Sequence, residues 1–313
     1  METTENLNLA TLAKHFSDEH AAWELVESIR WPDGPVCPHC GSDDKSYRLK
    51  NRPKKSSEIS PRRLWKCASC RKQFSCLVGT IFERSHVPLS KWLLATHMMC
   101  AGKNGVSAHE LHRQLGVALK TAWFMAHRIR EAMKRDPLAG MLTGTIEADE
   151  TYIGGKRRGS RRGRPGPDSH KTAVSTLVSR DGEARSQVME RVTGDDLGKV
   201  LADNVEPEAT LVTDEYAAYR KPGQGFAQHE TVNHAQGEYG RGAVTTNTVE
   251  GFFSQLKRSI DGTHHHVTRR HLPRYLAEFD YRYSTRDLTD GQRTWRTIQQ
   301  AGGRRLRYQQ TKN

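Results

Sequence analysis

Three carboxylates stand in sequence settings suited to binding divalent cations. Asp149 lies near the end of a strand-like run, Asp214 ends a short apolar run, and Glu250 lies in a helix-like segment. Between Asp214 and Glu250 there are 35 residues, at positions 215–249. Glu147 shares a strand face with Asp149, and their mutual repulsion is costly unless a cation compensates for it. Converging carboxylates fit phosphoryl transfer assisted by two metal ions about 3.5–4 Å apart, whereas an exposed acidic strand end is the alternative interpretation.

A basic residue accompanies the third carboxylate. Lys257 follows Glu250 by seven residues, which on a helix is two turns and therefore the same face. A cation at this place can hold a phosphate beside the carboxylates.

Four of the six cysteines form two CxxC pairs. The pairs are Cys37 with Cys40 and Cys67 with Cys70. The 26 residues 41–66 separate them. Each pair places two thiolates on one tight turn, and two such turns close a tetrahedral site. The spacing therefore predicts a structural zinc ion.

The charge of the chain favours a polyanionic partner. Its 313 residues include 49 Lys and Arg against 36 Asp and Glu, which gives a formal charge of +13. Basic side chains gain affinity by releasing counterions from phosphates, so nucleic acid is the simplest partner and a generally basic soluble protein is the alternative. No run approaches the roughly 18 apolar residues of a membrane span, and the polar start lacks a signal-peptide core. We therefore expect no membrane partner and a cytoplasmic, nucleoid-associated location.

The first part of the chain is predicted to hold a packing helical segment followed by two DNA-binding modules. We expect an N-terminal helical segment at 1–34, a zinc ribbon at 35–85 and a helix-turn-helix region at 86–137. In the last region, a short glycine-containing turn precedes a basic helix at 120–134, the pattern in which the second helix enters the major groove. A packed helical pair is the alternative. The candidate DNA contacts on this helix are Lys120, Arg128 and Arg130.

The second part changes to strands and predicts an α/β catalytic domain at 138–290. Strands are expected at 144–153, 171–179, 186–192 and 210–214, with a helix at 194–204. Strands on short glycine-containing loops, followed by helices, fit the RNase H-like layout. A basic tail is expected at 291–313.

A glycine-rich basic loop lies between the first two strands, at 156–167. Its six Gly, Ser or Pro residues exclude a core, and its six positive charges favour an anion. A solvated loop is the alternative to a contact with the DNA backbone. The candidate contacts are Arg157, Arg158, Arg161 and Arg162.

The order of these parts resembles bacterial insertion-sequence transposases of the zinc-ribbon type with a D-D-E catalytic domain. The resemblance spans nearly the whole chain. The matching segments are CPHC, CASC, EADETYIGGK (147–156), VTDEYAAY (212–219), TNTVEGFFSQLKR (246–258) and HLPRYLAEFDYRYSTR (271–286).

The resemblance implies roles for individual residues. Asp149, Asp214 and Glu250 become the acid triad that holds two Mg²⁺ or Mn²⁺ ions, with Lys257 as the basic companion. Asn247 is the rival for the third position, because some members of the group have Asn there. Lys257 and Arg258 become contacts to double-stranded DNA.

The resemblance also implies an activity and its partners. The enzyme hydrolyses DNA at terminal inverted repeats, and the resulting 3′-hydroxyl attacks a target strand, with the protein acting as a homo-oligomer. Two alternatives stay open at this point: a sequence-specific DNA-binding regulator with an inactive nuclease fold, and a structure-specific nuclease.

Overall fold

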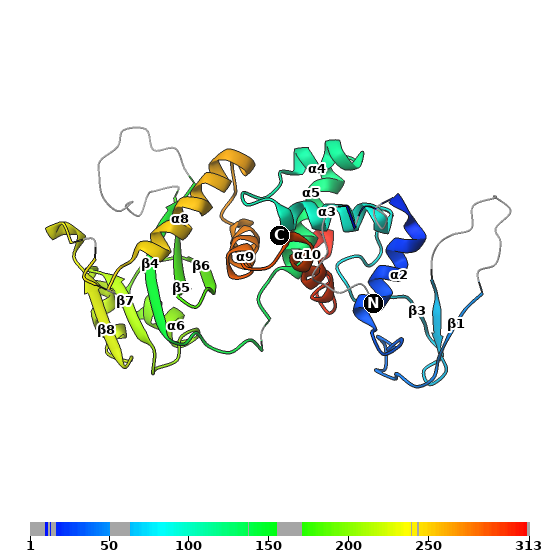
Figure 1. Ribbon diagram of the computed structural model, residues 1–313, viewed down its shortest axis with the longest axis horizontal. Helices are drawn as coiled ribbons and strands as arrows, with labels where there is room; N and C mark the ends of the chain where they lie inside the picture. Colours follow the sequence, from blue (N-terminus) through cyan, green and yellow to red (C-terminus); the bar gives the residue numbers. More distant parts are fainter. Residues whose placement is uncertain are drawn as a thin grey trace. The chain divides into compact units, whose positions relative to one another are not determined.

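The structure is a computed structural model, and it falls into two compact units. It describes residues 10, 11, 13, 17–50, 63–136, 138–154, 171–238, 240–242 and 244–311. Contacts assign Met1–Met133 together with Leu288–Asn313 to the first unit and Lys134–Asp287 to the second. Figure 1 labels the elements of both.

The first unit contains a small antiparallel sheet of three strands. These are β1 (Ser46–Arg48), β2 (Trp65–Cys67) and β3 (Gln73–Phe74), in the order β1-β2-β3. Trp31 packs edge-on against two aromatic rings of the sheet, with ring centroids 6.5 Å from Trp65 and 5.6 Å from Phe74. Helix α2 (Glu19–Arg30) precedes Trp31. This sheet lies within the region 35–85 that was predicted to be a zinc ribbon.

The helical part of the first unit contains the predicted pair of helices. Helix α3 spans Leu89–Ala101, α4 spans Ala108–Leu115 and α5 spans Leu119–Ala132. The Ser107 side chain accepts a hydrogen bond from the Glu110 amide and caps α4. Gly116 ends α4 in the left-handed region at φ 60°, which glycine adopts without a steric penalty. The tight turn between the two helices is therefore confirmed.

The C-terminal segment differs from the expected tail at 291–313. Helix α10 (Asp290–Gln299) packs on α3, and a 3₁₀ turn follows at Tyr308–Thr311. The α10 face toward α3 is polar: Thr294 Oγ1 lies 3.0 Å from His97 Nδ1, and Arg293 donates to the Cys100 carbonyl at 2.8 Å. A helix that buries polar groups lacks the apolar periodicity by which helices are recognised in sequences.

The second unit is built on a mixed five-stranded sheet in the order β6-β5-β4-β7-β8. The strands are β4 (Thr145–Ile153), β5 (Thr172–Ser179), β6 (Ala184–Met189), β7 (Thr210–Asp214) and β8 (Gln228–Val232). Strands β4, β5 and β6 are antiparallel neighbours, whereas β7 is parallel to β4 and β8 is parallel to β7. Strands β4, β5, β6 and β7 overlap the four ranges predicted from the sequence. Strand β8 was not predicted, because it is a mostly polar edge strand with only Val232 buried.

Helices cover both faces of this sheet. Helix α6 (Gly194–Ala202) shares one apolar core with Ile146, Ala148 and Leu211, while α8 (Asn247–Ser259) and α9 (Leu272–Ser284) share the other with Ile153 and Val174. The short elements are Ala217–Tyr219, α7 (Arg220–Gly223), His234–Gln236 and a π-helical turn at Ile260–His264. The mixed α/β fold is consistent with the predicted RNase H-like class. Within the described residues, no helix is long and apolar enough to span a membrane.

Candidate active site and zinc site

Asp149, midway along β4, lies beside Asp214, the last residue of the parallel strand β7. Ala148 of β4 is paired with Thr213 of β7, so the residues that follow them are neighbours in the same register. Carboxyl ends of parallel strands are the usual place for ligand sites in open α/β sheets. The fold therefore brings together two carboxylates that are far apart in sequence.

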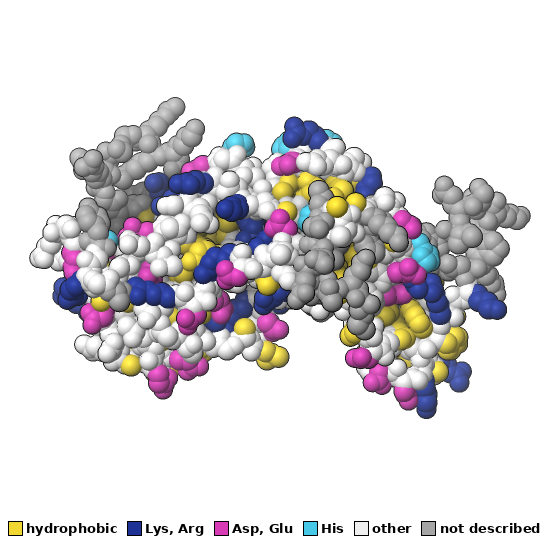
Figure 2. All heavy atoms as spheres, in the orientation of Figure 1, with side chains coloured by type: hydrophobic (Ala, Val, Ile, Leu, Met, Phe, Trp, Pro, Cys, Tyr) yellow, Lys and Arg dark blue, Asp and Glu magenta, His cyan; other side chains and the backbone are white. Residues whose placement is uncertain are grey.

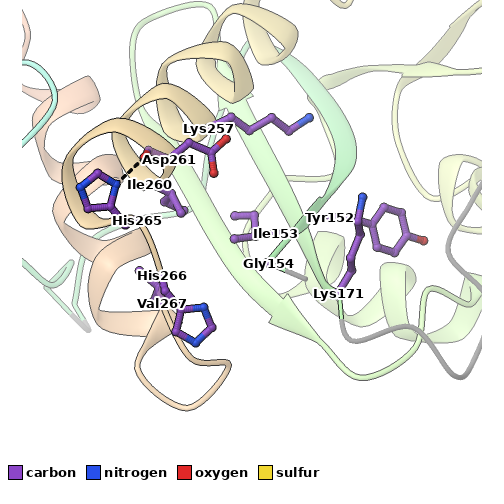
Figure 3. Close-up of a pocket in the computed structure, with 10 residues that line it drawn as sticks. All are labelled: Tyr152, Ile153, Gly154, Lys171, Lys257, Ile260, Asp261, His265, His266 and Val267. Atoms are coloured by element: carbon purple, nitrogen blue, oxygen red, sulfur yellow. Dashed lines mark hydrogen bonds between the residues drawn. The ribbon is translucent and has the colours of Figure 1, made fainter. Parts of the chain in front are cut away.

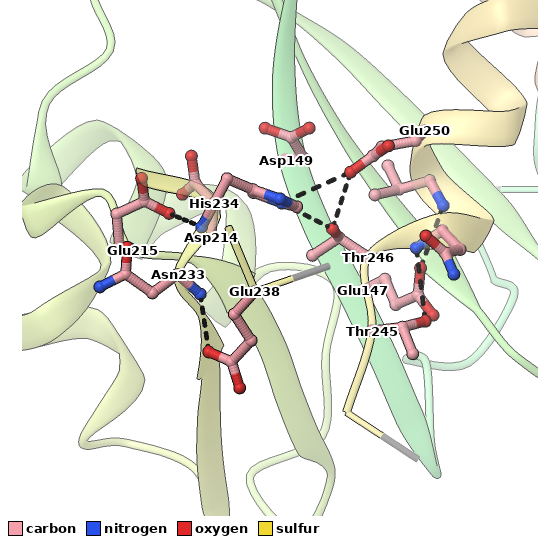
Figure 4. Close-up of polar contacts among 12 residues, drawn as sticks. Glu147, Asp149, Asp214, Glu215, Asn233, His234, Glu238, Thr245, Thr246 and Glu250 are labelled. Atoms are coloured by element: carbon pink, nitrogen blue, oxygen red, sulfur yellow. Dashed lines mark hydrogen bonds and ion pairs between the residues drawn. The ribbon is translucent and has the colours of Figure 1, made fainter. Parts of the chain in front are cut away.

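Glu250 reaches the same place from the first turn of α8. Figure 4 shows its carboxylate on the side of Asp149, with the two side chains projecting from α8 and β4. Burial first, and then the charges of Glu150, Asp214 and Glu250, raise the pKa of Asp149 to about 7, although the hydrogen bond from the Glu150 backbone amide opposes this. The three predicted acids thus share one electrostatic environment.

The oxygen atoms of these acids stand further apart than those of a closed metal site. In the part of the chain that the structure describes, the four cysteines form the one group of three or more His, Cys, Asp or Glu whose ligand atoms lie within 4.8 Å of one another. The present arrangement of the acids is that of an open cluster of hard oxygen donors.

His234 also lies in the site, although no role was predicted for it. Its Nε2 atom lies 3.2 Å from Thr246 Oγ1 and 3.5 Å from a Glu250 oxygen, and Thr246 Oγ1 donates to the same Glu250 oxygen at 2.9 Å. The His234 backbone amide donates to Glu215, the residue after Asp214, at 3.0 Å. These contacts tie the end of β7 to the start of α8 (Figure 4).

Glu147 lies beneath the site, on the same strand face as Asp149. Its side chain is fully buried, with a relative exposure of 0%. It accepts hydrogen bonds from the backbone amides of Thr248 and Val249 at 2.8 and 3.1 Å, and from Arg180 Nε at 3.0 Å. The predicted shared face of Glu147 and Asp149 is therefore observed, but Glu147 faces the helix start instead of solvent.

Lys257 lies beside a pocket of about 610 Å³ at the far end of α8. Lys171, Asp261, His265 and His266 also line this pocket, as Figure 3 shows. His265 adopts φ 57°, and its Nδ1 atom lies 2.9 Å from the Asp261 carbonyl oxygen. Two residues of the histidine run at 264–266 thus form part of the pocket wall.

The basic residues predicted to contact DNA differ in their exposure to solvent. Arg128 and Arg130 are buried, with 4% and 2% relative exposure. Arg128 stacks over the Trp92 ring, with its guanidinium carbon 5.1 Å from the ring centroid, and donates to the Glu83 carbonyl at 2.7 Å. Both arginines therefore belong to the interior of the first unit, which corrects their assignment as DNA contacts.

The other predicted contacts divide into exposed and undescribed residues. Lys120, Lys257 and Arg258 are exposed. Figure 2 shows basic side chains over the part of the second unit where α8 lies. The basic-loop residues Arg157, Arg158, Arg161 and Arg162 lie outside the described residues.

The four cysteines of the ribbon form a second candidate metal site, which offers thiol ligands instead of carboxylates. Their sulfur atoms all lie within 4.8 Å of one another. The Sγ atoms of Cys37 and Cys70 are 3.6 Å apart, and those of Cys40 and Cys67 are 3.7 Å apart. Tetrahedral zinc with Zn–S bonds of about 2.3 Å requires sulfurs about 3.8 Å apart. The spacing fits one zinc ion and confirms the predicted ligand set as a group.

Comparisons with known proteins cover both sites. Residues 141–284, which include the three acids and Lys257, match the ISXO2-like transposase domain, and residues 17–73, which include the four cysteines, match a transposase zinc-ribbon domain. The chain is also 30% identical over 287 residues to an uncharacterized protein in transposable element ISH50 of Halobacterium salinarum. That similarity covers 86% of this chain and 92% of the relative.

Proposed function

The chain belongs to the family of insertion-sequence transposases that combine a zinc ribbon with an ISXO2-like transposase domain, and from this premise we propose that it cuts and joins DNA with metal-bound carboxylates. The proposed substrate is double-stranded DNA carrying the terminal repeats of the element, and the proposed product is a strand joined to target DNA. One observation carries the proposal: Asp149 of β4 and Asp214 at the end of β7 are neighbours on adjacent parallel strands, and they share an electrostatic environment with Glu250.

The donor set fits Mg²⁺ or Mn²⁺. Asp149, Asp214 and Glu250 supply hard carboxylate oxygens, which these ions prefer over nitrogen or sulfur. The pKa of Asp149, about 7, reflects burial and then the negative charges around it, and a bound cation relieves both. Divalent ions held there supply Lewis-acid activation of the attacking and leaving oxygens.

The protein's own residues have separate tasks in this proposal. The carboxylates would serve as ligands of a divalent cation only in their ionised form. Lys257, on the Glu250 face of α8, neutralises a phosphate next to the reacting one. His234 and Thr246 hold the Glu250 carboxylate in its present rotamer through the contacts described above.

We assign the third ligand to Glu250 instead of Asn247. The charge of Glu250 acts on Asp149, and its carboxylate is oriented by Thr246. Asn247 is the first residue of α8, and exposure does not separate the two candidates because both side chains are exposed. A carboxylate also holds a divalent cation more strongly than a neutral amide does.

The DNA path is proposed from exposed basic residues. Lys257 and Arg258 lie on α8, and Lys171 lines the same pocket as Lys257. Lys120 and the basic loop at 156–167 remain proposed contacts to DNA backbone. Because two element ends must be held at once, we propose that a homo-oligomer acts, as is usual for symmetric assemblies.

A strand-transfer assay tests the proposed function. Terminal-repeat duplexes are incubated with Mg²⁺ and target DNA, and wild type is compared with Glu250→Ala and Asn247→Ala. We expect Glu250→Ala to lower cleavage and joining at least ~100-fold, because removing a metal-ligating carboxylate removes electrostatic stabilisation of the transition state, while Asn247→Ala retains most activity.

The same assay separates the alternatives. A DNA-binding regulator would bind the repeats without any metal-dependent cleavage. A structure-specific nuclease would cut without producing joined strands. Loss of activity with Asn247→Ala and its retention with Glu250→Ala would refute the assignment of the third ligand.

A further inference from the structure

We propose that Glu147 is a positioning residue that fixes the start of α8 to β4 and thereby sets the separation between the carboxylates of Asp149 and Glu250. The inference rests on the proposed function, because it takes these two carboxylates as metal ligands. Glu147 itself touches neither metal nor DNA in this proposal.

The buried Glu147 carboxylate uses both of its oxygens on the start of α8. Oε2 accepts the backbone amides of Thr248 and Val249 at 2.8 and 3.1 Å, and Oε1 accepts the Thr248 hydroxyl at 2.8 Å. These amides belong to the first turn of the helix, where backbone N–H groups have no intrahelical partner. Thr246 precedes the helix and provides no side-chain cap. Glu147 is therefore the cap of α8, supplied by a strand.

The link between the two ligands through Glu147 is short and contains no loop. Glu147 and Asp149 are two residues apart on one strand face, which is a distance of about 6.6 Å along β4. Val249, which donates to Glu147, is covalently joined to Glu250. By contrast, 35 residues separate Glu250 from Asp214 along the chain. The contact to Glu147 is the shortest connection by which β4 can determine where Glu250 stands.

Arg180 strengthens the same link from a second side. Its Nε atom donates to Glu147 Oε1 at 3.0 Å, and a terminal nitrogen donates to the Thr245 carbonyl at 3.2 Å. Its backbone amide is bonded to the Thr145 carbonyl at the start of β4. Arg180 thus holds both the strand and the residues just before α8. Such precision matters at a metal site because displacement of a ligand by about 1 Å costs about 100-fold in rate.

The first test is Glu147→Gln, which keeps the shape of the side chain and removes its charge. We expect the Mg²⁺ concentration for half-maximal cleavage to rise about 10- to 100-fold, the usual effect of removing a group that orients a metal ligand. Binding of Mn²⁺ to the full-length protein without DNA, measured by calorimetry, is expected to weaken by the same factor. Exchange of the Thr248 and Val249 amide hydrogens is expected to become faster.

Two further variants separate positioning from stability. Leu201→Ala truncates a buried side chain of α6 on the opposite sheet face, so it destabilises the unit and is expected to leave Mn²⁺ affinity unchanged. Thr248→Val removes one hydrogen bond to Glu147 in a side chain of the same shape. We expect Thr248→Val to lower Mn²⁺ affinity less than Glu147→Gln does. When the two changes are combined, their losses are not expected to add, because both disrupt one link.

The outcomes distinguish the positioning role from the proposed activity. The positioning role is overturned if Glu147→Gln and Thr248→Val keep wild-type Mn²⁺ affinity, or if Leu201→Ala lowers it equally. If wild type neither cuts nor joins DNA, the proposed function fails, while Mn²⁺ binding and hydrogen exchange still decide the role of Glu147. If Glu147→Gln does not fold, the Mn²⁺ affinity of Thr248→Val decides whether Glu147 has the positioning role.

Discussion

Asp280 gives a prediction whose magnitude can be worked out from its surroundings. Its carboxylate lies on α9 and accepts hydrogen bonds from the Ser186 amide at 2.8 Å and the Ser186 hydroxyl at 2.7 Å, which ties α9 to β6. Burial raises its pKa from 3.8 to about 7, although the bonds from Ser186 oppose this. At ~1.4 kcal/mol per pKa unit, ionising Asp280 in the folded protein costs about 4 kcal/mol more than in the unfolded chain.

The sign of the pH dependence follows from the raised pKa. Between about pH 4 and pH 7 the folded state binds more protons at Asp280 than the unfolded state does, so this group lowers stability as the pH rises through that window. Above about pH 7 its penalty is constant. Asp280→Asn cannot ionise, so we expect a variant that is more stable than wild type by about 2–4 kcal/mol at pH ~8 and nearly equal to it at pH ~4.

The assay must follow the second unit alone. All six tryptophans lie outside 134–287, so tryptophan fluorescence does not report on this unit. Unfolding in urea is therefore followed by hydrogen exchange of the β6 and α9 amides, since circular dichroism would sum the signals of both units. Because other groups titrate in both proteins, the quantity to compare is the difference between variant and wild type at each pH. A difference that does not change with pH, or a variant that is less stable near pH ~8, would refute the argument.

Two shorter predictions concern the zinc site and the DNA path. Cys67→Ser is expected to lower the zinc content from one ion per chain and to expose the ribbon to proteolysis, since structural zinc contributes on the order of 10 kcal/mol to folding; full zinc retention measured by elemental analysis would contradict the ligand set. Lys257→Glu is expected to weaken DNA binding and to reduce its logarithmic salt slope by ~1 or more, whereas Lys199→Glu, on α6 across the sheet, is the matched control with little effect. Equal salt slopes for the two variants would remove Lys257 from the DNA path.

The strands that carry the acids could be predicted because their residues are buried in runs. Strand β5 is buried along its whole length, β4 has a buried run at 146–148 and β7 has one at 211–213, which gives the mostly apolar runs that propensity reasoning detects. The pairing of β4 with β7 is different. It joins residues about 65 positions apart, so only the fold places Asp149 beside Asp214.

The burial of the Arg128 and Arg130 side chains on α5 could not be predicted from the sequence. Charged residues on a basic helix suggest an exposed face, but Arg128 is stacked on aromatic rings and is bonded to a carbonyl oxygen. Arginine tolerates this position because its planar group is weakly hydrated and has hydrogen-bond donors in its plane. The sequence gives charge and spacing, whereas burial depends on Trp92 of α3, an element earlier in the chain.

The starts of the helices show why the site could be predicted in part only. Helices α4 and α6 begin at Ser107 and Thr193, whose own side chains cap them, and such local signals can be read from a sequence. Helices α3 and α8 have no such cap, and each receives a glutamate from far upstream. Glu19 accepts the Leu89 amide across 70 residues, and Glu147 accepts the Thr248 amide across 101 residues.

A distant cap has a consequence that a local cap does not have. A local cap stabilises a helix wherever that helix lies, but a carboxylate from another element also fixes the helix start in space. For α8, that fixed point is one residue from Glu250 and two residues from Asp149 on the capping strand. The acids can therefore be identified from their types and spacing, while the distance between them depends on a buried glutamate whose partners become visible only in the folded chain.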